Sequence, residues 1–167
     1  MKLLALLNPE SVSDHEAGSY RVREAARAVV IDNADMVALL YVKDGNYYKL
    51  PGGGIKQEED PVTALKRECL EEVGVEIEVL DDIGVIVEYK KPFNLKQTSY
   101  CFVARVKGEK GMPAFTKKEI KEGFELAWVA VNDAKQLLAE GRPTTLESSD
   151  YIIPRDRLIL ETGLKTL

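Results

Sequence analysis

Three glutamates stand close together in the chain, at a spacing that allows them to act as one group. Glu68, Glu71 and Glu72 occupy positions i, i+3 and i+4, which places their carboxylates on one face of a helix. Like charges so placed repel each other, and a bound cation reverses that penalty. Mg²⁺ prefers oxygen ligands and keeps waters and substrate phosphates in its shell, so the cluster favours Mg²⁺, with Mn²⁺ as a substitute. A solvated acidic helix face is the alternative interpretation. Zinc is disfavoured because the chain has one histidine and no thiolate cluster.

Three consecutive glycines precede this helix. Gly52, Gly53 and Gly54 connect a short strand to the loop before the helix, where positive φ or close backbone approach would require glycine. Backbone N–H groups of Gly52 and Gly54 could bind a phosphate, and the Gly53 carbonyl could join the metal shell. An ordinary tight turn is the alternative.

Arg67 and Glu59 are expected to support the site. Arg67 lies off the acidic stripe and could reach back to Glu59 in the loop, joining loop and helix by a bidentate pair. If exposed, such a pair contributes little to stability. We therefore interpret it as structural support.

Together these residues resemble the Nudix box, the signature of the Nudix (MutT-like) hydrolases. In that signature Gly is followed after five residues by Glu, and after seven more by Arg-Glu-apolar-x-Glu-Glu-x-Gly-apolar. The matching positions are Gly53, Glu59, Arg67, Glu68, Cys69, Glu71, Glu72, Gly74 and Val75. One position departs from the family pattern: the residue before the loop Glu is often Gly, and here it is Glu58. Either the loop turns differently, or Glu58 is an additional ligand or a replacement for Glu59.

The resemblance implies a Mg²⁺-dependent pyrophosphohydrolase. Its substrate would be a nucleoside diphosphate linked to another moiety, of the nucleotide, ADP-ribose or sugar-nucleotide type. The metal ligands implied are Gly53, Glu68, Glu71 and Glu72, and Glu68 and Glu71 are also catalytic candidates. Two alternatives stay open. A nucleotide-sensing domain usually lacks some of the metal glutamates, and isoprenoid diphosphate isomerisation needs a reactive cysteine, for which Cys69 is badly placed.

The general base varies across the family. Glu122, a few residues before the strand that carries Trp128, is our candidate, and Glu119 and Glu125 compete with it. An exposed loop glutamate is the alternative for each.

Substrate contacts are the least determined part of the site. Arg27, Lys43 and Lys49 flank the expected cleft and could contact phosphates. A solvated charge at a strand edge is the alternative for each of them.

Composition and charge limit the partners. The chain has 167 residues, of which 45% are hydrophobic and 31% charged, and its net charge is −5 without a dense Lys/Arg block. A broad nucleic-acid footprint is not expected from this charge, whereas a small anionic substrate is compatible with it. The apolar run at 3–7 is too short for a signal peptide or a membrane span, so we expect a cytoplasmic protein. Because many family members are homodimers, a homodimer is an open expectation by analogy.

The predicted elements form one α+β domain over residues 1–167. We expect an α/β/α sandwich in which a mixed sheet packs between helices. The first twenty residues are either a flexible arm or a segment that packs on a partner subunit. Strands are predicted at 25–31, 36–42, 47–50, 77–87, 99–106 and 126–131. Helices are predicted from Pro61, capped by Asp60, to about Val73, and at 133–140 and 151–161.

Overall fold

A seven-stranded mixed sheet forms the centre of the protein, in a computed structural model that describes residues 1–167. The strands are β1 (Leu3–Leu7), β2 (Arg21–Ile31), β3 (Met36–Val42), β4 (Tyr47–Lys49), β5 (Glu76–Lys90), β6 (Leu95–Lys107) and β7 (Phe124–Ala130). The α-helices are α1 (Asp14–Ala17), α2 (Pro61–Glu72), α3 (Lys117–Lys121), α4 (Val131–Glu140) and α5 (Ile153–Gly163). A 3₁₀ turn, η1 (Lys91–Phe93), and a π-helical turn, η2 (Ser148–Ile152), complete the chain.

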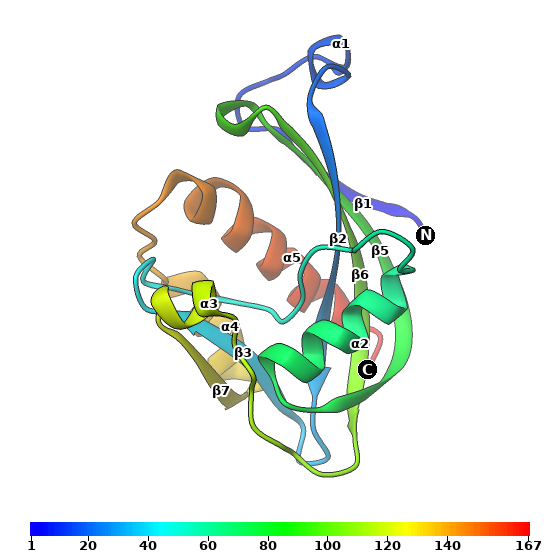
Figure 1. Ribbon diagram of the computed structural model, residues 1–167, viewed down its shortest axis with the longest axis vertical. Helices are drawn as coiled ribbons and strands as arrows, with labels where there is room; N and C mark the ends of the chain where they lie inside the picture. The colour runs from blue at the N-terminus through cyan, green and yellow to red at the C-terminus, as the bar shows by residue number, and fades with distance from the viewer.

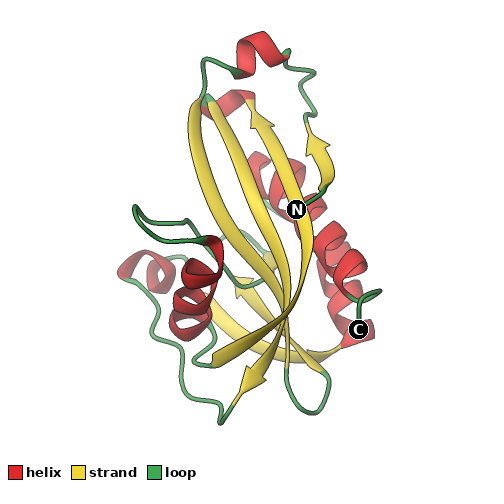
Figure 2. Cartoon of the chain, turned by 90° about the vertical axis from the view of Figure 1, so that its right-hand side faces the viewer, coloured by secondary structure: helices red, strands yellow, loops and turns green.

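The sheet combines parallel and antiparallel pairs. Its strand order is β1-β5-β6-β2-β3-β4, and β7 pairs with β3. The pairs β1–β5 and β2–β6 are parallel, and the others are antiparallel. Helices cover both faces: α2 lies on one side of the sheet and α5 on the other (Figure 2). The predicted α/β/α arrangement with a mixed sheet is therefore confirmed.

The sheet divides between β2 and β3, and this division creates the opening in which the site lies. The two strands pair at Ile31 and Val37. Farther along β3, β4 takes the place beside it. The loop after β4 then crosses to the edge of β2, where Gly53 O accepts from Ala26 N and Pro51 O accepts from Ala28 N. The two groups of strands diverge from this point (Figure 1).

Each face of the sheet has its own core. On the α2 face, Ala64, Leu65 and Cys69 of the helix pack against small and β-branched residues of β2, β5 and β6. On the other face, Leu138 of α4 and Ile159 of α5 pack with side chains of β2, β3, β5 and β6. Alternate residues of β2 point to opposite faces, so this strand contributes to both cores.

Local signals set the limits of α2. The Asp60 side chain accepts from Val62 N and Thr63 N, and Pro61 occupies the first turn. At the other end Gly74 has φ +72°, a conformation that favours glycine. The predicted helix, from Asp60 to about Val73, agrees with these bounds.

Other predictions need correction. Residues 3–7 are not a flexible arm, because they form β1 and pair in parallel with Val85–Glu88 of β5. The strands β2, β5 and β6 extend beyond their predicted ends towards α1, at the upper end of Figure 1. The helix α3 was not predicted, although Thr116 and Glu119 form a capping box that marks its start. None of the helices is long and apolar enough to cross a membrane.

Candidate active site

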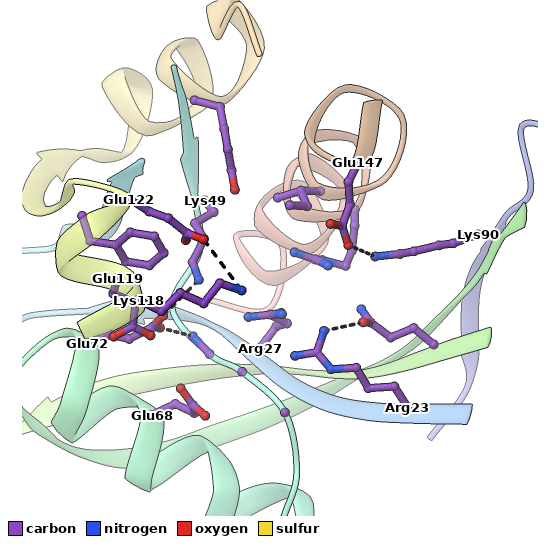
Figure 3. A pocket seen from close by; sticks show the side chains of 18 residues that line it. Arg23, Arg27, Lys49, Glu68, Glu72, Lys90, Lys118, Glu119, Glu122 and Glu147 are labelled. Carbon is purple, nitrogen blue, oxygen red and sulfur yellow. Dashed lines mark hydrogen bonds and ion pairs between the residues drawn. The ribbon is translucent and has the colours of Figure 1, made fainter. Parts of the chain in front are cut away.

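A cleft of about 330 Å³ opens where β2 leaves β3, and most of its lining is charged. It is lined by Arg23, Arg27, Tyr47, Lys49, Gly52, Gly53, Gly54, Glu68, Glu72, Lys90, Gln97, Lys118, Glu119, Glu122, Phe124, Glu147, Ile152 and Arg155. The charges are distributed unevenly. Carboxylates from α2 and α3 lie at one end, and basic side chains from β2, β5 and α5 lie at the other (Figure 3). We refer to these ends as the acidic half and the cationic half.

Glu72 is the most enclosed carboxylate of the acidic half. It is 1% exposed; one oxygen lies 3.0 Å from Lys49 Nζ, and the other accepts from Gly52 N at 2.7 Å. Burial raises the pKa of Glu72, while Lys49 and the Gly52 N–H act in the opposite direction. Lys49, predicted to contact substrate, does line the cleft, but it is paired with this carboxylate. Its ammonium also lies 4.9 Å from the centre of the Phe124 ring.

Glu68 lies one turn earlier and packs against the glycine loop. A side chain at Gly53 would overlap the Glu68 carboxylate, and one at Gly52, where φ is +126°, would overlap the Ala26 carbonyl. Close approach to backbone and positive φ therefore require glycine at Gly52, whereas a side chain at Gly53 would displace the Glu68 carboxylate from the loop. The Gly53 carbonyl, predicted as a metal ligand, instead accepts from Ala26 N at 2.9 Å. It is directed towards β2 because the loop runs along the edge of that strand.

Arg67 joins the loop to the helix. Its Nε and Nη2 donate to the two oxygens of Glu59 at 2.8 and 3.0 Å, and Nη2 also donates to Gly54 O at 2.9 Å. Nη1 donates to Glu68 at 2.6 Å. The guanidinium thus holds the loop, the helix and one carboxylate of the cleft together. Its hydrogen bonds to Glu59 lower the pKa of that carboxyl group to about 2.

This shift predicts acid sensitivity. Because the folded pKa of Glu59 lies below its ordinary value of 4.5, its ionised form stabilises the fold above that pH. The contribution is lost as the pH falls from about 4.5 towards 2. We expect Glu59→Gln to flatten this part of the curve of unfolding free energy against pH, measured by urea denaturation. An unchanged slope would show that Arg67 does not perturb Glu59 in solution.

Glu58, the departure from the family pattern, is an exposed residue with φ +69°. The loop therefore adopts at this position the left-handed conformation that glycine favours. Glu58 does not line the cleft, and Glu59 is paired with Arg67.

We expect Glu58→Gly to stabilise the protein. A non-glycine residue in the left-handed conformation costs roughly 1–2 kcal/mol, which the substitution removes. The greater conformational entropy of glycine in the unfolded chain costs about 0.5–1 kcal/mol and offsets part of this stabilisation. The net gain of about 0.5–1 kcal/mol should raise Tm by roughly 2 °C in a thermal melt. Gln57→Gly is the matched control, because Gln57 is exposed and has no positive φ. It should lower Tm, and the same sign for both variants would contradict the argument.

The structure does not bring every predicted residue to the cleft. Glu71 and Lys43 do not line it. At about 100° per residue, Glu71 and Glu72 point in directions about 100° apart, so only one can face the opening. Glu71 turns towards Arg67, 3.5 Å away. Lys43 follows the end of β3 and packs against Gly123. Among the candidates for the base, Glu119 and Glu122 line the cleft and Glu125 does not.

The cationic half was largely missed by the sequence analysis. Arg27 was predicted, but Arg23, Lys90 and Arg155 were not. Lys90 and Arg155 are 1% and 2% exposed. A signal was present: polar residues occupy inward positions of β5, β6 and α5, where strand alternation and helical periodicity favour apolar ones. These buried residues are Glu88, Lys90, Gln97, Ser99, Arg155 and Asp156.

Comparison with known proteins decides the family. The model of the NUDIX domain matches residues 22–149, which is most of the chain. The chain belongs to the Nudix family. Members of this hydrolase family act on phosphoanhydrides and generally use divalent metal ions.

Individual relatives of this Nudix chain agree with that assignment. A MutT-like protein of Streptomyces ambofaciens is 27% identical over 138 residues, which are 83% of this chain and 80% of the relative. An RNA pyrophosphohydrolase of Helicobacter pylori is 41% identical over 56 residues, which span 33% of this chain and 36% of that protein. The structure of a Nudix hydrolase from Nitrosomonas europaea superposes with a TM-score of 0.61 at 17% identity. The superposition covers 88% of this chain and 96% of that one.

The acidic half fits a divalent ion that is completed by substrate. No three acidic, histidine or cysteine side chains lie close enough together to hold a metal by themselves. Mg²⁺, however, is usually bound through one or two carboxylates together with substrate phosphates. Glu68 and Glu72 supply two carboxylates to the cleft.

Proposed function

We propose that this protein is a Mg²⁺-dependent pyrophosphohydrolase. Its substrate is a nucleoside diphosphate linked to another moiety, and it cleaves a phosphoanhydride bond. The observation that carries the proposal is the pair Glu68 and Glu72, one turn apart on α2 and facing the cleft, with Glu119 of α3 and its C-cap residue Glu122 lining the same half. Mn²⁺ should substitute for Mg²⁺, since it also accepts oxygen ligands. The cytoplasmic location and the homodimer stay predictions.

The residues of the acidic half have separate roles in the hydrolysis. Glu68 and Glu72 hold the metal, which when bound neutralises charge on the phosphoryl oxygens and lowers the pKa of the attacking water. Arg67 positions Glu68. Glu122 accepts a proton from the water as its oxygen bonds to phosphorus. The bridging P–O bond then breaks, and the leaving phosphate takes the electron pair.

Of Glu119 on α3 and Glu122 at its C-terminal end, Glu122 is the better candidate for the base. The Glu119 side chain accepts from Thr116 N at 2.7 Å and caps the helix. Glu122 has only a 3.7 Å ion pair with Lys118, so its oxygens are available to a water in the cleft.

The direct test is a substrate panel. Purified protein would be incubated with 8-oxo-dGTP, dNTPs, ADP-ribose, sugar nucleotides and diadenosine polyphosphates, with Mg²⁺, with Mn²⁺ and with chelator. Chromatography would then separate the products. We expect metal-dependent cleavage of one class between the phosphates. Tight binding without cleavage across the panel would overturn the proposal in favour of a nucleotide-sensing domain.

We expect Glu122→Gln to lower kcat about 100-fold or more while KM changes little, because a general base acts only in the transition state. Steady-state kinetics on the best substrate of the panel would measure both constants. Glu125→Gln is the matched control, three residues away, exposed and outside the cleft. An equal loss in both variants, or none in Glu122→Gln, would remove Glu122 from this role.

A further inference from the structure

Cleavage of the diphosphate as proposed above does not involve the basic residues of the cationic half. We propose that the cationic half is an oxyanion-binding subsite centred on Arg27, so that the moiety linked to the scissile diphosphate carries its own phosphate or carboxylate. The inference rests on the proposed function, of which it specifies the substrate class.

The first observation is the state of the Arg27 side chain. Arg27 is 6% exposed, and its Nε and Nη1 atoms are buried without any hydrogen-bond partner. The side chain lines the cleft and lies between the acidic half and the other basic residues (Figure 3). A buried guanidinium without partners is costly, and an oxyanion bound at one edge of the group would supply an acceptor for Nε or for Nη1.

The second observation is the charge around Arg27. The other basic residues of the cationic half are Arg23, Lys90 and Arg155. Arg155 Nε donates to Asp156 at 2.7 Å, and Lys90 Nζ lies 3.0 Å from Glu147 and 3.4 Å from Glu88. Arg23 donates to the neutral Gln97 at 3.0 Å. The cationic half thus contains four cationic side chains and three carboxylates that pair with them. None of those carboxylates forms a hydrogen bond with Arg27.

The pKa of Arg27 is shifted in the direction expected from this excess of positive charge. Burial lowers the pKa of Arg27, and repulsion from Arg155 adds to that effect. Attraction from Asp156 and Glu72 only partly offsets it. An anionic ligand would supply the negative charge that the folded chain does not.

The third observation is the polar lining around Arg27. The two aromatic side chains of the cleft are Tyr47, on β4, and Phe124, whose ring lies beside Lys49 in the acidic half. Around Arg27 the lining consists of charged and amide side chains together with Ile152. Such a surface suits a charged, hydrogen-bonding group and not a nucleobase. The base of the substrate therefore belongs nearer to the Phe124 ring, which lies beside Lys49.

The subsite can be tested without metal or substrate. In chelator, NMR of the ¹⁵N-labelled protein would follow the Nε–H signal of Arg27, assigned by its loss in Arg27→Gln. Titration with inorganic phosphate and with acetate would distinguish the two oxyanions. Chloride at equal ionic strength is the blank. We expect a saturable shift with at least one oxyanion, weakened in Arg23→Gln and unchanged in Arg21→Gln, which alters an exposed arginine of the same strand outside the cleft. No saturable shift with either oxyanion would overturn the proposal.

Matched substrates test the substrate class. UDP-glucuronic acid differs from UDP-glucose by a carboxylate, and ADP-ribose 1″-phosphate differs from ADP-ribose by a phosphate, each on the moiety linked to the diphosphate. With Mg²⁺, we expect kcat/KM to be about tenfold or more higher for the anionic member of at least one pair. Arg27→Gln should remove that preference, as expected for the loss of a charge-assisted hydrogen bond. Equal losses for both members would mean that Arg27 binds the common diphosphate, and would overturn the inference.

The two experiments separate the two claims. A saturable shift of the Arg27 signal without any cleavage would contradict the pyrophosphohydrolase and leave the subsite standing. Metal-dependent cleavage with no shift and no preference within either pair would contradict the subsite alone. If none of the four compounds is cleaved, the NMR titration decides the inference.

Discussion

Glu72→Gln should reduce kcat by about 10²–10³-fold and leave the fold intact, because it removes charge stabilisation from the reacting phosphate and little else. Glutamine has nearly the same shape, and its amide oxygen can still accept from Gly52 N. The ionised carboxylate is buried, and burial raises its pKa, so loss of the charge also removes a desolvation cost. Lys49 loses its partner, but it lines the cleft and can reach water.

Kinetics over a range of Mg²⁺ concentrations, together with circular dichroism and a thermal melt, would measure this effect. Glu71→Gln is the matched control: it alters the neighbouring glutamate, which turns away from the cleft towards Arg67. We expect it to lose less than about tenfold. Wild-type turnover of Glu72→Gln at limiting Mg²⁺ would contradict the assignment of Glu72 as a metal-holding residue. An equal loss in Glu71→Gln would show that Glu71 also reaches the metal.

The acidic half of the site could be predicted from sequence because its determinants are local. The cap at Asp60, the spacing of Glu68 and Glu72 and the stop at Gly74 all lie within one helix and its ends. Arg67 and Glu59 are eight residues apart, so their contact is also nearly local. Helical periodicity could not decide which of two adjacent glutamates faces the opening, since that depends on how α2 lies across β2.

The cationic half could not be predicted because it is assembled from distant segments. Arg23 and Arg27 come from β2, Lys90 from the end of β5 and Arg155 from α5. Their proximity depends on the parallel pairing of β2 with β6 and on the packing of α5 against the sheet. Each of these residues taken alone looks like an ordinary surface charge. The burial of Arg27, Lys90 and Arg155 in the structure shows otherwise, and polar residues in otherwise apolar stretches were the only hint of it in the sequence.

The strand β1 was missed for a related reason. A five-residue apolar run is short, and its partner, β5, lies about eighty residues later in the chain. Polar residues at the ends of β2, β5 and β6 likewise concealed the length of those strands. These ends stay extended because the strands pair with one another as far as Leu95 of β6. Leu95 pairs with Arg21 of β2 on one side and with Lys90 of β5 on the other.

Asp156→Ala should destabilise the protein by about 3–5 kcal/mol, the range expected when one partner of a buried ion pair is removed. Asp156 is fully buried; one of its oxygens accepts from Arg155 Nε at 2.7 Å and the other from Leu50 N at 2.8 Å. Alanine would leave a buried guanidinium with only the 3.6 Å ion pair to Glu88, and a buried N–H without an acceptor. Burial lowers the pKa of Arg155, but Asp156 and Glu88 more than offset this, so the pKa is raised and the charge must stay.

Urea denaturation at neutral pH would measure this loss, with Glu161→Ala as the matched control, since Glu161 is an exposed acid on the same helix. That variant should stay within about 0.5 kcal/mol of the wild type. Asp156→Asn should fall between the two, because the amide oxygen can accept only part of what the carboxylate accepts. Leu50 directly precedes Pro51 and Gly52, so its bond to Asp156 also positions the glycine loop beside Glu72. Turnover in Asp156→Asn should therefore fall even at temperatures where the variant is folded, and unchanged turnover there would show that the loop holds its place without α5.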